Sequence, residues 1–226
     1  MDINSVTIES PFHGVQIYRN TLPKELNLVG RLEDVLTDNT DPWMRWSPAL
    51  VGDYQSMPDY RDCVDFKVRS KDFETRPNIP ELKSVYDDVD ERLQVCMRHY
   101  TEKYHLSMGF QEAVNFVRYG ENQHFATHSD SGFSYVCAVS SVMYLNDDYE
   151  GGELYFPHID LTYTPSEGDI VLFPSNWLFS HAALPVKSGI KYSAVTMFDY
   201  TDRYHNEEFN NFVVQKANRE RAKASQ

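Results

Sequence analysis

The sequence predicts a mainly β chain with N-terminal helices, an α+β fold whose strands form a closed or double-sheet architecture such as a jelly roll. Three observations support this fold class. Apolar residues recur at steps of three and four within residues 80–104, whereas a period of two dominates from Gln111 onward. The second part contains roughly eight short apolar runs separated by turn-forming residues. Aromatic residues make up 14% of the chain, which is typical of β-rich cores.

The N-terminal part begins with a short strand, a helix and a loop. Residues 13–18 (HGVQIY) have the pattern of a strand, and Pro23 begins a helical pattern that runs through residues 26–36. Residues 41–62 are rich in Pro, Asp and aromatic residues and show no period, which predicts a long ordered loop. Such loops serve as substrate lids or as packed connectors, and the residues leave both interpretations open.

The strongest predicted helix spans residues 80–104. Its apolar side chains fall on one stripe, which comprises Leu82, Val85, Tyr86, Val89, Leu93, Cys96, Met97, Tyr100 and Tyr104. An amphipathic helix buries such a stripe against another element. We therefore expect this helix to cover a sheet formed by the segments that follow.

The predicted strands of the second part are short and follow one another closely. They are residues 112–119, 124–129, 133–146, 152–157, 161–165, 169–175, 180–186 and 191–200. No internal repeat or Gly/Ser linker divides the chain, so a single domain is expected. Within it, residues 1–110 form a helical and strand buttress, residues 111–200 the β core, and residues 201–226 a tail that is a surface helix or a frayed terminus.

The charge and the cysteines narrow the functional class. Lys and Arg total 21 against 34 Asp and Glu, a formal net charge of −13, which disfavours nucleic acid as a partner because its binding depends on neutralising phosphates. Cys63, Cys96 and Cys137 form no CxxC pair, so neither a zinc site nor a disulfide framework is indicated. The sequence has no signal-peptide pattern and no membrane-spanning apolar run, which predicts a soluble, cytoplasmic protein without a membrane partner.

Two His-x-Asp triplets are candidates for metal binding, His128-Ser-Asp130 and His158-Ile-Asp160. Residues i and i+2 of a strand point to the same face, so such a triplet at a strand end directs two ligands to one point. His181 follows His128 by 53 residues (181 − 128) and begins an apolar run, as a third ligand on a neighbouring strand would. It follows His158 by only 23 residues (181 − 158), which leaves little room for intervening strands. The first triplet is the expected metal site, and the second is interpreted as a loop pair.

Two histidines and one carboxylate on one face of an octahedral ion leave three positions open for O₂ and a bidentate cosubstrate. This arrangement is typical of non-haem iron(II) oxygenases. Lys191 lies ten residues after His181 (191 − 181) and opens the last predicted strand. A lysine there is suited to pair with a distant carboxylate of the cosubstrate.

The same region resembles a known family. The stretches VRYGENQHFATHSD, VMYLNDDYEGGELYFP and PSEGDIVLFPSNWLFSHAALPVKSGIKYSAVTMF resemble, in order and spacing, the prolyl 4-hydroxylase branch of the 2-oxoglutarate/iron oxygenases. The resemblance covers residues 113–199. It implies a double-stranded β-helix, a variant of the jelly roll, buttressed by the N-terminal helices.

The resemblance also implies which residues bind the metal and the cosubstrate. His128, Asp130 and His181 match the family's iron ligands. Lys191 matches the basic residue that pairs with the C5 carboxylate of 2-oxoglutarate. We expect these four residues to be the catalytic set.

Further residues are expected to bind the cosubstrate. Tyr119 and Tyr144 fall where family tyrosines hydrogen-bond to 2-oxoglutarate, although a tyrosine on a β strand is also an ordinary core residue. Ser193 would share the face of Lys191 and assist it. Phe125 and Trp177 either line the target pocket or simply pack against neighbouring residues.

The expected function is hydroxylation of a substrate C–H bond, most simply in a peptidyl proline, with Fe(II), 2-oxoglutarate and O₂, and with ascorbate as a reductant. A peptide or protein is therefore the expected partner, and no oligomeric state is indicated. A nucleic-acid or small-molecule substrate is an alternative. Nucleic-acid demethylating relatives place a second Arg six residues after the first basic residue, and here Met197 occupies that position. A further alternative is a cupin-like metal-binding barrel without turnover.

Overall fold

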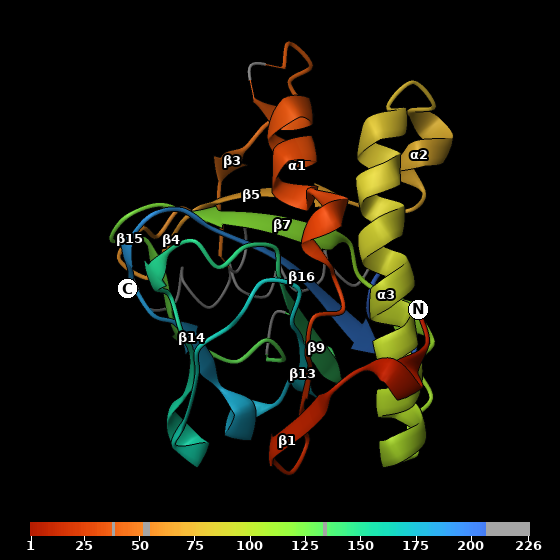
Figure 1. Ribbon diagram of the computed structural model, residues 1–226, viewed down its shortest axis with the longest axis vertical. Coiled ribbons are helices and arrows are strands. Elements are labelled where there is room, and N and C mark those ends of the chain that lie inside the picture. The colour runs from red at the N-terminus through yellow and green to blue at the C-terminus, as the bar shows by residue number, and fades with distance from the viewer. Residues whose placement is uncertain (38, 52–54, 133–134, 207–226) are drawn as a thin grey trace, which may run out of the picture.

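The computed structural model describes residues 1–37, 39–51, 55–132 and 135–206 (Figure 1). Within these residues the strands form a nine-stranded sheet, a five-stranded sheet and a two-stranded pair, all of them antiparallel. The two larger sheets face each other, so the predicted double-sheet architecture is confirmed. Most of the predicted C-terminal tail lies outside the described residues.

The large sheet has the strand order β1-β2-β13-β9-β16-β7-β5-β3, and β6 pairs with the far end of β16. Its strands are β1 Ile8–Phe12, β2 Val15–Tyr18, β3 Ser47–Pro48, β5 Val64–Val68, β6 Phe110–Gln111, β7 Val114–Tyr119, β9 Val139–Tyr144, β13 Ile170–Pro174 and β16 Lys191–Asp199. The long central strand β16 pairs with β9 on one side and with β7 on the other. Residue 191 therefore lies within the sheet rather than at its edge.

The smaller sheet has the order β12-β11-β14-β8-β4. Its strands are β4 Arg61–Asp62, β8 His124–His128, β11 Leu154–Phe156, β12 Leu161–Tyr163 and β14 His181–Ala183. The short pair consists of β10 Glu150–Gly151 and β15 Val186–Ser188. Side chains from both sheets fill the space between them, and the cluster of Val15, Ile17, Val142, Tyr144, Leu154, Phe156, Val171 and Phe173 forms this inner core. Alternation along each strand directs one set of residues into the inner core and the other set outward.

Helices cover the outer face of the large sheet (Figure 1). The longest, α3 Pro80–Tyr104, has the predicted bounds: Pro80 occupies the first turn and His105 ends the helix in a left-handed conformation. Helix α1, Leu28–Leu36, packs beside it and begins after a 3₁₀ turn at Lys24–Leu26 rather than at Pro23. Their apolar stripes form the outer core with the outward residues of the large sheet.

The N-terminal part contributes more to the sheets than its sequence pattern indicates. Besides the expected strand β2, strands β1 and β5 belong to the large sheet. Residues 41–62 lack long regular elements, as predicted, but the described part includes β3, and its end forms β4 beside β8. Residues 52–54 and 133–134 lie outside the described residues, and strand β9 begins at Val139. Among the described helices, none is both long and apolar enough to cross a membrane.

Candidate active site

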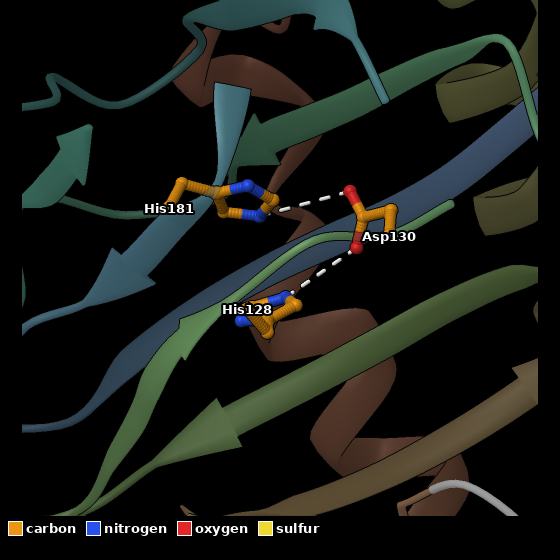
Figure 2. Close-up of side chains that lie close together, drawn as sticks. All are labelled: His128, Asp130 and His181. Atoms are coloured by element: carbon orange, nitrogen blue, oxygen red, sulfur yellow. Dashed lines mark ion pairs between the residues drawn. The ribbon is translucent and has the colours of Figure 1, made fainter. Parts of the chain in front are cut away.

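Three side chains predicted as metal ligands meet at one end of the smaller sheet (Figure 2). His128 ends β8 and His181 begins β14, and the two residues are paired in the antiparallel register. Asp130 follows β8 by two residues, with one oxygen 3.4 Å from Nε2 of His128 and the other 3.7 Å from Nε2 of His181. One ligand atom of each residue lies within 4.8 Å of the others, and no other such group was found among the described residues.

The backbone fixes the orientation of both imidazoles. Nδ1 of His128 lies 2.9 Å from the carbonyl oxygen of Ala126, and Nδ1 of His181 lies 3.1 Å from that of Phe179. A carbonyl only accepts a hydrogen bond, so each Nδ1 carries the proton. Nε2 therefore presents its lone pair to the shared point, as a metal-binding histidine requires.

The Asp130 side chain is 6% exposed, and its carboxyl group is charged. Although burial alone would raise the pKa of Asp130, the neighbouring His181 and His128 and a hydrogen bond from Ser140 hold it below its usual range. The Ser140 hydroxyl donates to Oδ2 of Asp130 at 2.6 Å and lies 2.7 Å from the Ser175 hydroxyl. Burial lowers the pKa of His181 to about 4, so this imidazole is neutral at physiological pH. A charged carboxylate beside the neutral imidazole of His181 fits a divalent cation.

Aromatic rings enclose the histidines. Phe125 stacks on His128 with ring centroids 3.6 Å apart and planes 13° apart. Phe173 and Phe156 lie 4.8 and 5.7 Å from the His181 ring. These apolar contacts hold the two imidazoles in place and limit water around them.

A buried lysine lies deeper in the same space between the sheets. Lys191 is 2% exposed, and its Nζ donates to the Gly152 carbonyl at 2.6 Å. The ammonium lies 5.3 and 5.4 Å from the ring centroids of Tyr119 and Tyr144. No carboxylate oxygen of the described residues lies within 4.0 Å of Nζ, and burial lowers the pKa of Lys191 to about 8. A buried cation without an anionic partner fits a ligand that brings a carboxylate.

The other predicted cosubstrate residues surround this lysine. Tyr119 is the cross-strand partner of Lys191, and Tyr144 lies opposite Ser193 on the other neighbouring strand. The Tyr144 hydroxyl is buried and has no hydrogen-bond partner. Burial raises the pKa of Tyr144, which keeps this hydroxyl protonated as a donor. An unpaired buried donor beside a buried ammonium is a second feature that fits an anionic ligand.

The structure adds two residues that the sequence pattern did not single out, Ser140 and Gly152. Ser140, which hydrogen-bonds to Asp130, is a polar residue in the apolar strand β9. It lies two and four positions before Val142 and Tyr144, so it points to the inner face with them. This position in the strand was the only sequence signal for Ser140. Gly152, at φ +65°, lies against the lysine: a Cβ there would meet the Lys191 Cδ at 3.0 Å. The glycine therefore makes room for Lys191 as well as forming a turn.

The second triplet does not form a comparable centre. His158 lies in the 3₁₀ turn Pro157–Ile159, and Asp160 ends that turn in a left-handed conformation. Both residues are exposed, as a loop pair would be. The His158 ring contacts Trp177 edge-on at 6.5 Å, and Trp177 itself is 72% exposed. Trp177 therefore does not pack into the core, whereas Phe125 does pack, against His128.

The family of the central segment follows from sequence comparison. Residues 114–199 match the sequence model of the 2OG-Fe(II) oxygenase superfamily. This segment is therefore similar to that superfamily. The family resemblance seen in the motifs is thereby confirmed, and the predicted cofactors iron(II), 2-oxoglutarate and O₂ are those that the 2OG-Fe(II) oxygenases imply.

Individual relatives of the 2OG-Fe(II) oxygenase segment carry hydroxylase names. A PKHD-type hydroxylase of Crocosphaera subtropica is 32% identical over 121 residues, covering 50% of this chain and 52% of the relative. A putative prolyl 4-hydroxylase of Acanthamoeba polyphaga mimivirus is 27% identical over 141 residues, covering 54% of each chain. The chain thus matches about half the length of these two relatives.

Solved oxygenase structures share the fold over most of the chain. A prolyl hydroxylase from Trichoplax adhaerens, in complex with a peptide fragment of hypoxia inducible factor, has a TM-score of 0.65 at 14% identity and covers 88% of this chain and 86% of its own. A Pseudomonas putida prolyl-4-hydroxylase has a TM-score of 0.60 at 19% identity, covering 82% and 92%. The viral collagen prolyl hydroxylase of Paramecium bursaria Chlorella virus-1, complexed with 2-oxoglutarate, has a TM-score of 0.58 at 17% identity, covering 82% and 95%. These likenesses confirm the predicted helix-buttressed jelly-roll fold.

Proposed function

We propose that this protein is an Fe(II)- and 2-oxoglutarate-dependent dioxygenase that hydroxylates a C–H bond, with a peptidyl proline as its substrate. One observation carries the proposal. The only His/Asp group of metal-binding geometry among the described residues shares the space between the sheets with a buried lysine that has no carboxylate partner. We therefore assign a cation site and an anionic cosubstrate site to the space between the two sheets.

His128, Asp130 and His181 would hold the iron. Bound there with 2-oxoglutarate and O₂, the ion supplies oxidising power for C–H hydroxylation. The protein's own part is to hold two neutral imidazoles and one charged carboxylate in a fixed orientation. The Nδ1–H bonds to the backbone and the Ser140 hydrogen bond provide this orientation.

Lys191 would bind the far carboxylate of 2-oxoglutarate. Its ammonium is already in place in the inner core, so binding costs little side-chain entropy. The unpaired Tyr144 hydroxyl would donate a further hydrogen bond, and Tyr119 and Ser193 lie on the strands around the ammonium. Their shared role is to select a dicarboxylate of the right length by position and charge.

The relatives and the charge favour a peptide as the substrate. The viral relative is named a putative prolyl 4-hydroxylase, and the Trichoplax enzyme was solved with a peptide. A net charge of −13 suits a neutral or basic peptide better than nucleic acid. Met197, half-buried on β16 in place of a second Arg, also counts against the nucleic-acid alternative. A small-molecule substrate remains the second candidate, and ascorbate as a reductant stays a prediction.

The decisive experiment is anaerobic titration of the full chain with iron(II) and 2-oxoglutarate. We expect a visible charge-transfer band that vanishes when O₂ is admitted, with formation of succinate. Addition of proline-containing peptides should then stimulate succinate formation and yield a hydroxylated peptide. If folded, iron-loaded protein shows no band and forms no succinate, the oxygenase proposal fails in favour of a cupin-like barrel. Succinate formation that responds to other substrates but to no peptide would refute only the prolyl assignment.

A further inference from the structure

The Glu33 carboxylate accepts hydrogen bonds from three side chains that belong to different segments of the chain, on the outer face of the large sheet. Its Oε1 accepts from the Tyr192 hydroxyl at 2.8 Å and from Nε1 of Trp46 at 3.1 Å. Arg118 donates to both carboxylate oxygens, at 3.2 and 3.4 Å. The Arg118 guanidinium also lies 5.1 Å from the centroid of the Trp46 ring. We call these four residues the Glu33 cluster.

The Glu33 cluster lies directly behind the proposed cosubstrate site. Tyr192 and Arg118 are cross-strand partners in β16 and β7, and the next pair in the register is Lys191 with Tyr119. Successive residues of a strand point to opposite faces, so the first pair faces α1 while the second faces the inner core. The same short piece of backbone therefore carries the Glu33 contacts on one face and Lys191 on the other.

The electrostatics favour a charged Glu33 carboxylate. Although partial burial alone would raise the pKa of Glu33, hydrogen bonds from Thr37 and Tyr192 and the charge of Arg118 hold it below its usual value. The carboxylate thus remains an acceptor for donors from β16 and β7 over the whole physiological pH range. Hydrogen bonds to a charged acceptor are stronger than those between neutral groups, which suits a rigid clamp.

Helix α1 does not depend on Glu33 for its attachment. Leu28, Leu32 and Leu36 are buried in the outer core, and Arg31 forms an ion pair with Asp88 of α3 at 2.8 Å. The Glu33 carboxylate instead reaches across to the strands. Its removal should leave the helix docked while it frees the side chains behind the cosubstrate site.

We infer that Glu33 is a positioning residue that fixes Lys191 and Tyr119 by clamping the Tyr192–Arg118 pair behind them. This inference rests on the proposed function, because it assigns a role relative to 2-oxoglutarate. Tyr192 is held from a second side as well, since its backbone N–H donates to Oδ1 of Asn146 at 2.7 Å. The hydrogen bond from the Tyr192 hydroxyl to Glu33 limits the motion that remains, which is rotation of β16 or its displacement toward α1.

The test is calorimetric binding of 2-oxoglutarate to the full chain loaded with Mn(II), which replaces iron without reacting in air. For Glu33→Gln we expect 2-oxoglutarate to bind roughly tenfold more weakly, the lower end of the cost of removing a supporting hydrogen-bond partner. The affinity for Mn(II) should not change, because the clamp lies behind Lys191 and not behind the His/Asp group. Asp88→Asn is the matched control: it removes another ion pair of α1 and should leave 2-oxoglutarate binding unchanged.

Tyr192→Phe supplies a second, milder variant that retains the ring and removes the donor to Glu33. We expect it to weaken 2-oxoglutarate binding in the same direction, and the double variant to be less than additive because both changes break one contact. If Glu33→Gln and Tyr192→Phe lower the melting temperature but leave 2-oxoglutarate affinity intact, Glu33 is only structural and the inference is wrong. Failure of the unaltered protein to bind 2-oxoglutarate would instead overturn the proposed function itself.

Discussion

His128 and His181 lie opposite each other on neighbouring antiparallel strands, because they are direct partners in the register of β8 and β14. Their ring centroids are 4.4 Å apart, and each Nε2 is near a different oxygen of Asp130. A slip of one residue in this register would turn one imidazole to the other face of the sheet. The pairing of two short strands thus determines whether the two imidazoles and the Asp130 carboxylate meet.

Substitution of Asp130 should remove metal binding. Asp130→Ala leaves two neutral imidazoles without the charged ligand, so we expect iron(II) affinity to fall by at least about a hundredfold and 2-oxoglutarate turnover to be lost. Asp160→Ala, in the second His-x-Asp triplet, is the matched control and should bind iron normally. Iron content after desalting and calorimetric titration would measure both. Equal iron binding by both variants would mean that the ligands are misassigned.

The neighbouring serines of β9 offer a sharper comparison. Ser140 donates to Asp130, whereas Ser141 faces away and donates to the Thr196 carbonyl at 3.0 Å. Ser140→Ala should reduce metal affinity by roughly tenfold to a hundredfold, because the carboxylate loses the bond that orients it. Ser141→Ala should reduce stability by about 1 kcal/mol without affecting metal affinity. Calorimetric titration of both variants would measure their metal affinities, and we expect Ser140→Ala to bind the metal more weakly than Ser141→Ala. The reverse order would contradict this role for Ser140.

Lys191 should lower the free energy of unfolding of the ligand-free protein, although it would bind 2-oxoglutarate. Its burial shifts the pKa from 10.5 to about 8, which corresponds to a cost on the order of 3 kcal/mol at neutral pH. Lys191→Met should therefore raise the free energy of unfolding without ligand and abolish protection by 2-oxoglutarate. The exposed Lys187→Met is the control, with little change in either quantity. Denaturant unfolding with and without 2-oxoglutarate would measure both quantities. A Lys191→Met protein that is less stable than the unaltered ligand-free protein would contradict the predicted cost of burying this lysine.

The pH dependence of Lys191 has opposite signs for stability and for binding. Between about pH 8 and 10.5 the unfolded chain holds a proton on this lysine that the ligand-free native state has lost, so this group makes stability rise with pH in that window. Binding of 2-oxoglutarate needs the ammonium, so affinity should fall by up to about tenfold per pH unit above pH 8. Titrations at several pH values would measure both trends. Affinity that is flat from pH 7 to 9 would exclude Lys191 as the anion partner.

Removal of the unpaired Tyr144 hydroxyl should show whether this group binds 2-oxoglutarate. In the ligand-free protein Tyr144→Phe removes a buried donor without a partner, so stability should be unchanged or slightly higher. If the hydroxyl donates to 2-oxoglutarate, affinity should fall by roughly tenfold to a hundredfold, the contribution of one hydrogen bond to a charged group. Calorimetry on the two proteins measures this difference. Unchanged affinity would make Tyr144 a plain core residue.

The site residues were accessible to sequence reasoning because strand geometry is local. In His128-Ser-Asp130 the two-residue spacing directs both side chains to one side. Spacing along the predicted strands, together with the family motifs, indicated His181 and Lys191 on later strands. The two histidines are partners on paired strands of the smaller sheet, and the paired strands of the large sheet carry Lys191, Tyr119, Tyr144 and Ser193. Their roles toward a metal and a cosubstrate stay predictions that the experiments above test.

The sequence by itself determined the period of each segment: a helix at residues 80–104, a series of short strands after it, and the two ligands within one triplet. Only the tertiary structure decided that strands β1 and β5 join the large sheet, that Ser140 hydrogen-bonds Asp130, and that Glu33 lies behind Lys191. The physical reason is the range of the interactions. Periodicity and turn propensity act over a few residues, whereas strand register and side-chain pairing join residues more than a hundred positions apart, such as Glu33 and Tyr192.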